Sequence, residues 1–555
     1  MKPLPVLVAF AFAFSACAPI TPASAPAPTR VEAPTPPPTP ERPAATEPLE
    51  VVPDRWWLLD AATDAVVGAS VDRAYSEILS QKQPRRQVVV AIIDSGVDIT
   101  HEDLDDVLWT NDDEVANGRD DDGNGYVDDV HGWNFIGGPD GRHVDDDTYE
   151  VTRLHATCEN QQRGATHAAA LPGITPTAAE CTEIAAEFAG MRAENEQMLA
   201  QVRQMDAAVT TFVALLRQHM GTDSLTVEGV RALAPVQTDV RQAQQIYLQL
   251  ADNDITPTMI RNEVERIESL LENGLNPDFN PRGIVGDDYA DRTQRVYGNA
   301  GVTGPDASHG TGVAGIVAAE RENDIGVEGI ADAVRIMTIR AVPNGDERDK
   351  DVANAIRYAV DNGADIINMS FGKAYSPNKD VVDAAVRHAE EQGVLLIHAA
   401  GNDAKDLAAE TNFPNRYYET GGAASNWIEV GASSWEGREQ LAANFSNFGS
   451  EQVDVFAPGA TILAATPGDD YAPNSGTSFA APVVTGVAAL LMAYYPDLSV
   501  ADVRRIILES ATRYADQVVA APGPPGRQVR FGELSATGAV VNAYEAVRMA
   551  EQTGR

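Results

Sequence analysis

The segment that most limits how this chain can fold is a run that is apolar on every side, residues 479–491. A helix that is hydrophobic all round has to be buried in the core of a large domain. The turn Gly476-Thr477-Ser478 opens this helix, so the Ser478 hydroxyl stands beside its unpaired amides and positive dipole end. A nucleophile that attacks a carbonyl needs such surroundings, because an oxyanion develops next to it. Taken alone, an ordinary capping serine is the alternative.

Two further segments supply an acid and a base. The apolar run Val88–Ile93 is typical of a parallel strand buried on both faces, and Asp94 follows it at the carboxyl end, where open α/β sheets place their sites. His309 opens a segment of small residues, 310–319, that permits close packing of a helix on the sheet. Each residue alone is more often structural, but together with Ser478 they form the set required for nucleophilic hydrolysis.

The remainder of the chain alternates strand-like and helix-like segments. Expected strands are 334–339, 366–369, 394–397, 428–430 and 453–456, and expected helices are 352–362 and 381–392. This alternation predicts an α/β fold with a doubly wound parallel sheet and helices on both faces. After the serine helix, Ser499 and Asp502 form a capping box for another helix, and residues 540–550 are expected to form a last surface helix.

Five motifs resemble the sequence blocks of the subtilisin-like serine peptidases (subtilases), in that family's order. They are Asp-Ser-Gly at 94–96, His-Gly-Thr at 309–311, Asn-Met-Ser-Phe-Gly at 368–372, Ala-Ala-Gly-Asn at 399–402 and Gly-Thr-Ser-x-Ala-Ala-Pro at 476–482. The resemblance covers about residues 88–135 and 280–515. It implies a subtilisin-like fold and an endopeptidase that hydrolyses peptide bonds through an acyl-enzyme.

The resemblance also implies residue roles. Ser478 would be the nucleophile, His309 the base, Asp94 its orienting acid and Asn402 the oxyanion-hole amide. The walls and floor of the primary specificity pocket would be Ser370, Phe371 and Gly372, then Ala399, Ala400 and Gly401, and finally Asn412. None of these residues is acidic, so we expect apolar or uncharged substrate side chains to be preferred over lysine or arginine.

A carboxylate-rich loop at 120–129 places oxygen ligands at alternate positions before a glycine, as in the first half of a calcium loop. Its candidate ligands are Asp120, Asp122, Asn124 and Asp128. His131 stands where an EF-hand has glutamate, so a solvated acidic turn is the alternative. The resemblance implies a second calcium site between Asp103 and Asn323. We expect structural calcium and no cofactor for catalysis.

The long separation of Asp94 and His309 indicates an insertion at residues 150–280. Apolar residues recur there at spacings of three and four, which predicts a helical hairpin or three-helix coiled coil. The seam residues are Ile184, Phe188, Met191, Asn195, Met198, Val202, Met205, Val209, Phe212 and Leu216, then Val236, Val240, Ala243, Tyr247 and Leu250, then Ile260, Val264, Ile267 and Leu271. Thr256 and Pro257 would open the last helix. A lid, a partner-binding arm, a substrate filter and a structural elaboration all remain open.

Cys158 and Cys181 lie near the base of the insertion. In an exported protein they are expected to form a disulfide worth roughly 3 kcal/mol in the chain-entropy description, with two free thiols as the alternative.

The first 17 residues resemble a bacterial lipoprotein signal in which Cys17 becomes the lipidated residue, with an ordinary secretory signal as the alternative. Ala18 then indicates an outer-membrane lipoprotein that faces the periplasm or the exterior. Residues 18–48 are Pro-rich and expected to form a tether. The peptidase domain would occupy 49–149 and 281–555. The interval from Trp56 to Val88 is too short for the folding propeptide of many subtilases, so we expect folding without one.

Composition excludes other classes of protein. A formal net charge of −41 makes nucleic acid an unsuitable partner, and after the N-terminus no segment was expected to span a bilayer. The expected partners are protein or peptide substrates and the membrane that holds the Cys17 lipid, and the oligomeric state stays open. A peptide ligase with the same triad and a catalytically silent scaffold lipoprotein are alternatives, whereas an esterase is disfavoured because the Gly-x-Ser-x-Gly elbow is missing.

Overall fold

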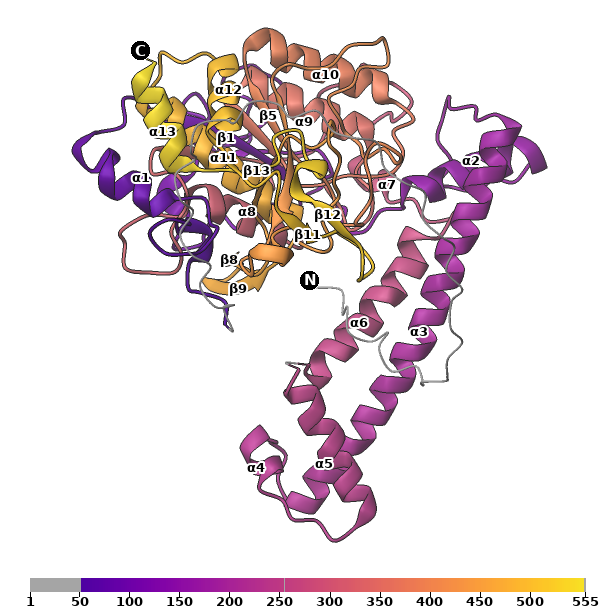
Figure 1. Ribbon diagram of the computed structural model, residues 1–555. Coiled ribbons are helices and arrows are strands. Elements are labelled where there is room, and N and C mark those ends of the chain that lie inside the picture. Colours follow the sequence, from indigo (N-terminus) through magenta and orange to yellow (C-terminus); the bar gives the residue numbers. More distant parts are fainter. Residues whose placement is uncertain (1–50, 254, 554–555) are drawn as a thin grey trace, which may run out of the picture.

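The computed structural model describes residues 51–253 and 255–553, so Cys17, the expected signal and the tether lie outside the described residues. A nine-stranded sheet forms the centre, in the order β10-β13-β7-β6-β5-β4-β1-β3-β2. Its neighbouring strands run parallel, except for the antiparallel pair β10 and β13. The predicted parallel α/β architecture is confirmed (Figure 1).

The strands of this sheet are β1 (Val88–Asp94), β2 (Gly132–Asn134), β3 (Val334–Arg340), β4 (Ile366–Met369), β5 (Leu395–Ala399), β6 (Trp427–Ser433), β7 (Val455–Pro458), β10 (Thr512–Arg513) and β13 (Ala539–Val540). Two hairpins lie outside it, β8 (Ile462–Thr466) with β9 (Asp470–Asn474) and β11 (Val518–Ala520) with β12 (Gln528–Arg530). The helices of this body are α1 (Val71–Glu77), α7 (Arg282–Val285), α8 (Ser308–Ala318), α9 (Asp349–Asp361), α10 (Lys379–Gln392), α11 (Thr477–Tyr494), α12 (Val500–Ser510) and α13 (Ala543–Gln552).

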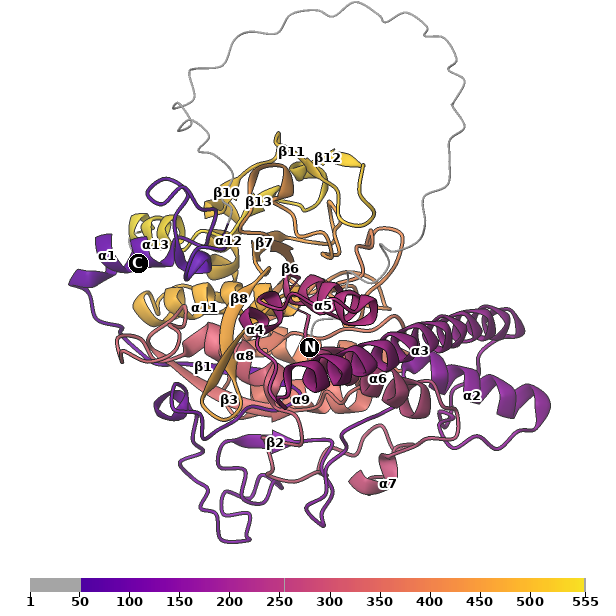
Figure 2. The ribbon, with the colours of Figure 1, turned by 90° about the horizontal axis from the view of Figure 1, so that it is seen from below.

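Helices cover both faces of the sheet, which explains the continuous apolar run of β1. Val88, Val90 and Ile92 pack with α8 and α11 in one core cluster. Ala91 and Ile93 point to the other face and pack with α9 and α10. In Figure 2, α8 and α11 lie next to each other. Alternate residues of β1 therefore pack into two separate hydrophobic cores, one on each face of the sheet.

Helix α11 contains the apolar run 479–491 and lies in the core of the protein. By length and composition it is apolar enough to cross a membrane, contrary to our expectation of no such segment, but 94% of it is buried inside the protein. The same apolar surface therefore makes it the central core helix.

The predicted last helix begins later than expected. Val540 belongs to β13 and pairs with Phe456 of β7, and α13 begins at Ala543 because the Asn542 side chain caps it. The capping box of Ser499 and Asp502 is present at the start of α12. Strands β2, β10 and β13 are only two or three residues long, too short to show a periodicity in sequence.

Residues 150–274, between β2 and α7, form a long helical arm that leaves the body of the protein (Figures 1 and 2). Its helices are α2 (Glu150–Arg163), α3 (Ala178–Met220), α4 (Val227–Arg231), α5 (Thr238–Ala251) and α6 (Pro257–Ser269), followed by a π turn at Leu270–Gly274. The 43 residues of α3 run along α6 and α5 in turn. Thr256 caps α6 with Pro257 as its first residue, as predicted. Cys158 and Cys181 form the expected disulfide and tie α2 to α3.

Two positions of the predicted seam are wrong. Met198 is 43% exposed, and its neighbour Leu199 is buried instead. A straight helix drifts relative to a strict seven-residue repeat, so a neighbouring residue takes over the contact along so long a helix. Val236 is 90% exposed because it lies in the turn before α5, and the seam of that helix begins at Val240.

Candidate active site

The three residues of the predicted triad lie at one edge of the sheet. Asp94 is the last residue of β1, His309 is the second residue of α8, and Ser478 is the second residue of α11. Helices α8 and α11 pack against each other, and the ring of His309 meets that of Phe479 edge to face, with 5.4 Å between the centroids. The two helix starts are therefore neighbours at the carboxyl end of the strands, where parallel sheets place their sites.

Asp94 and His309 are joined by a hydrogen bond. Nδ1 of His309 lies 2.7 Å from Oδ1 of Asp94, whose side chain is 2% exposed while that of His309 is 39% exposed. Burial opposes protonation of the ring, but the charge and hydrogen bond of Asp94 outweigh it and raise the pKa of His309 above its usual value. The pair can thus orient the imidazole and stabilise its charged form.

Ser478 is nearly buried and tied to the segment that follows β4. Its Oγ donates to the carbonyl of Ser370 at 3.0 Å, and Oγ of Ser370 donates to the carbonyl of Ser478 at 2.8 Å. These reciprocal bonds hold the start of α11 against the end of β4.

The side-chain amide of Asn402 lies beside the first turn of α11. Its Oδ1 accepts from N and Oγ1 of Thr477, at 2.8 and 3.0 Å, which fixes the amide plane. A Cβ added to Gly476 would lie 3.5 Å from Nδ2 of Asn402 and 3.6 Å from the backbone N of Ser478. The side-chain nitrogen of Asn402 and the backbone nitrogen of Ser478 therefore lie near each other beside Gly476.

The residues expected to form a specificity pocket are also brought together. The side chain of Asn412 donates to the carbonyl of Ala400 at 3.2 Å, and a Cβ on Gly372 would come within 2.7 Å of the Asn412 amide. A Cβ on Gly401 would lie 3.5 Å from the same amide. Gly372 is thus needed for the close approach of Asn412, whereas the nearest obstacle to a Cβ on Gly401 is Nδ2 of Asn447 at 2.3 Å. Ala399 and Ala400 are buried, Ser370 is buried, and Phe371 is half-buried.

Asp103 and Asn323 are in contact, as the resemblance implied. Nδ2 of Asn323 donates to Oδ1 of Asp103 at 2.9 Å, and Oδ2 of Asp103 accepts from the amide of Val327 and the hydroxyl of Tyr471. Asp103 is fully buried, and within the described ranges it takes part in no ion pair. The groups that donate to its carboxyl oxygens are all neutral.

The acidic loop is folded around its own carboxylates. Oxygens of Asp120, Asp122 and Glu114 lie within 4.8 Å of one another. Glu114 was not predicted as a ligand, because it precedes the repeat pattern. Asn124 donates to Asp122, and Asp128 accepts from the amides of residues 117 and 118, so Asp128 closes the loop and is not in that group of carboxylates. An all-oxygen set of this kind suits a hard cation such as calcium.

Two residues that position this site were not predicted from the sequence, Thr477 and Asn447. Thr477 holds Asn402 and also accepts from the amide of Gly401 at 3.0 Å. Asn447 donates to the carbonyl of Ala400 at 2.8 Å and accepts from the amides of residues 403 and 405. Thr477 stood inside a quoted motif, but the loop that holds Asn447 carries no motif or periodicity.

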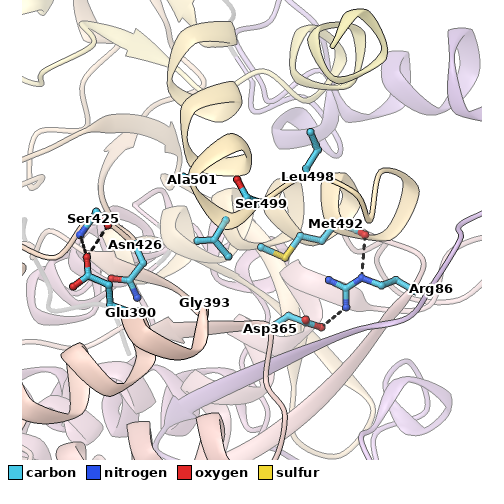
Figure 3. A pocket seen from close by; sticks show the side chains of 11 residues that line it. Arg86, Asp365, Glu390, Gly393, Ser425, Asn426, Met492, Leu498, Ser499 and Ala501 are labelled. Carbon is cyan, nitrogen blue, oxygen red and sulfur yellow. Dashed lines mark hydrogen bonds and ion pairs between the residues drawn. The ribbon is translucent and has the colours of Figure 1, made fainter. Parts of the chain in front are cut away.

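A hollow of about 450 Å³ lies at the opposite edge of the sheet (Figure 3). It is lined by residues that precede strands β1, β4, β5 and β6 and by the start of α12, and Arg86 pairs with Asp365 in it at 2.8 Å. The whole length of β1 separates this hollow from Asp94, so it is not part of the candidate active site.

The sequence is similar to those of known proteins. The profile of the Subtilase family matches residues 85–526. A thermophilic serine proteinase of Bacillus sp. (strain AK1) is 37% identical over 239 residues, which cover 43% of this chain and 54% of that protein. Subtilisin NAT of Bacillus subtilis subsp. natto is 34% identical over 251 residues, 44% of this chain and 60% of the relative. The chain thus spans little more than half the length of these two relatives.

A subtilisin of Bacillus pumilus is 34% identical over 44% of this chain and 82% of its own length. A solved cold-adapted subtilisin-like serine proteinase matches with a TM-score of 0.33 at 29% identity, over 39% of this chain and 72% of that one, a score too low to add to the assignment. The family profile spans most of the chain, and this chain therefore belongs to the Subtilase family.

Proposed function

We propose that this chain is a serine endopeptidase that hydrolyses peptide bonds through an acyl-enzyme. The observation that carries the proposal is the bond of 2.7 Å between His309 and Asp94 at the edge where α11 presents Ser478. Family membership supports it, because the residues in question stand in the family's own motifs. The proposed roles are nucleophile for Ser478, general base for His309 and orienting acid for Asp94.

In the proposed mechanism the Ser478 hydroxyl turns from the carbonyl of Ser370 towards Nε2 of His309. The neutral ring accepts the proton as Oγ attacks the carbonyl, and it later delivers this proton to the leaving amine. Asp94 stabilises the imidazolium that forms. The donors on Asn402 and on the backbone of Ser478 stabilise the oxyanion, a contribution of about 100- to 1,000-fold in kcat for one such donor. Water then takes the place of the amine and releases the acyl group.

The proposed substrates are proteins or peptides with an apolar or uncharged residue before the scissile bond. Ser370, Phe371 and Gly372 would pair with the substrate backbone, and the slot beside Asn412 would receive the side chain. The absence of a carboxylate from the residues assigned to this pocket supports the preference. Cleavage of a peptide library mainly after lysine or arginine would contradict it.

We further propose that calcium stabilises the fold and takes no part in catalysis. The acidic loop offers Asp120, Asp122 and Glu114, and the second position offers Asp103 with Asn323. The all-oxygen donors and the fully buried charge of Asp103 support binding of a hard cation.

The proposed location is the cell envelope, with the chain exported and anchored through Cys17. The signal-like N-terminus supports export, and so does the disulfide between Cys158 and Cys181, because such bonds persist in oxidising compartments. Mass spectrometry of the membrane fraction would detect a lipidated Cys17, and an unmodified chain in the soluble fraction would contradict the anchor.

The function is tested with casein and a defined peptide, using the wild type and the Ser478→Ala variant. Hydrolysis by the wild type alone is the expected result. Product analysis by mass spectrometry separates free carboxylate products from joined peptides, which would indicate a ligase. A folded wild type that cleaves neither substrate would favour the silent scaffold.

A further inference from the structure

A buried histidine outside the triad stands directly behind the proposed substrate-binding segment. His398 lies in β5 and is fully buried, with Nε2 2.8 Å from the carbonyl oxygen of Phe371. Its Nδ1 lies 2.9 Å from Oε1 of Glu429 on the neighbouring strand β6, opposite it in register. The other oxygen of Glu429 accepts from Nε1 of Trp427 at 2.8 Å. The chain of contacts thus runs from Trp427 through Glu429 and His398 to Phe371.

The donors and acceptors in this chain can be assigned. A carbonyl only accepts, so Nε2 of His398 carries a proton and donates to Phe371. On the other side, either Nδ1 of His398 or the carboxyl group of Glu429 carries the proton between them. In both cases the last link is the same N–H bond to the carbonyl of Phe371.

The carbonyls of Ser370 and Phe371 are held from opposite faces of the sheet. Ser370 accepts from Ser478, whose helix α11 packs on one face. Phe371 accepts from His398, beside Trp427 in the core of the other face. Each carbonyl is therefore fixed by its own donor.

The bond to Phe371 also determines where the next amide points. In a trans peptide the carbonyl oxygen and the following N–H point in opposite directions. The carbonyl of Phe371 points inward to His398, so the N–H of Gly372 points outward. Gly372 is exposed, and no group in the described part of the chain accepts from its amide.

We propose that His398 is a positioning residue that fixes the peptide plane between Phe371 and Gly372 and so presents the Gly372 N–H to the backbone of an extended substrate. This inference rests on the proposed function and assigns a role to a residue outside the triad, the oxyanion donors and the pocket walls. A substrate too short to reach Gly372 does not use this donor, whereas an extended peptide does.

The test compares two substrates on the full chain. One is a peptide with several residues before the scissile bond, and the other is an ester of a single acylated amino acid. The double variant His398→Leu/Glu429→Leu removes the donor without leaving the carboxylate buried alone. The matched control is Glu429→Gln, whose amide can donate to Nδ1 of a neutral His398 and accept from Trp427, which keeps the bond to Phe371.

For the double variant we expect kcat/KM on the peptide to fall about tenfold, mainly through KM, with the ester changed by less than about twofold. Glu429→Gln should stay close to the wild type on both substrates. The proposal would be overturned if a folded double variant kept the wild-type ratio of kcat/KM on the peptide to kcat/KM on the ester, whether both values are unchanged or both fall equally. A wild type that hydrolyses neither substrate would instead refute the proposed function.

Discussion

Replacing Gly310 by alanine should disable the Asp94–His309 pair without changing either residue. A Cβ at position 310 would lie 2.1 Å from the carbonyl oxygen of Gly96 and 3.1 Å from Cβ of Asp94, whereas ordinary contact begins at 3.4 Å. The backbone of Gly96 is itself packed closely against Thr303, because a Cβ on Gly96 would lie 2.1 Å from the Thr303 carbonyl oxygen. The nearer obstacle is a backbone oxygen that cannot rotate away, so the start of α8 has to move by about 1 Å, and a displacement of that size at a reacting group costs about 100-fold in rate.

The matched control is Gly312→Ala on the same helix. Its Cβ would lie 3.1 Å from the ring of Phe479 and 3.4 Å from both Cβ of Ala464 and the carbonyl oxygen of Ala465, so a shift of a few tenths of an ångström is enough to relieve it. Both substitutions gain the same intrinsic helix propensity, about 1 kcal/mol per residue, so propensity cancels in the comparison. We expect kcat/KM on a peptide amide to fall about 100-fold in Gly310→Ala and to stay within about threefold in Gly312→Ala. A folded Gly310→Ala variant with nearly wild-type kcat/KM would refute the reasoning.

Three other predictions follow from the same contacts. Asp94 raises the pKa of His309, and the base acts in its neutral form, so kcat/KM should rise with pH through a value above 6.5. Asp94→Asn should move this rise in kcat/KM to lower pH and reduce kcat by about 10⁴, and an unmoved pH profile would contradict the prediction. Burial would raise the pKa of Glu150, but Arg153 and Lys373 lower it from 4.5 to about 2. Above pH 4.5 the ionised carboxylate therefore stabilises the fold by about 3 kcal/mol, and this contribution is lost as the pH falls through 2. Urea titrations should therefore show the gap between wild type and Glu150→Gln closing over that range, and a constant gap would contradict it. Chelation of calcium should lower the Tm of the wild type by about 5 °C and that of Asp122→Asn by less, and an unchanged wild-type Tm would exclude calcium binding.

Much of the fold was predictable because each strand and helix of the body carries its own pattern. The run before Asp94 is apolar at every position because both faces of β1 are covered. The positions of the triad on β1, α8 and α11 followed from the motifs and from the rule that sites lie at the carboxyl ends of parallel strands. The shortest strands and the exact seam of α3 were not predictable, since two or three residues show no period and a straight helix drifts from a heptad.

Long-range polar contacts were the part that the sequence could not reveal. Lys373 follows the proposed substrate-binding segment, and its Nζ bonds Glu150, the first residue of α2, at 2.7 Å. The root of the helical arm is therefore joined by a buried ion pair to the residue beside Gly372. His398 and Glu429 are a similar case, because each interrupts an apolar strand. This pattern indicates a buried polar pair, but it does not indicate which carbonyl the histidine binds.

The most direct test of the central claim is labelling of the protein with a fluorophosphonate and mapping of the adduct by mass spectrometry. If Asp94, His309 and Ser478 act as one triad, the wild type should carry a single adduct on Ser478, and both Ser478→Ala and His309→Ala should lose it. A folded, calcium-loaded wild type without label, or an adduct on another serine, would contradict the account.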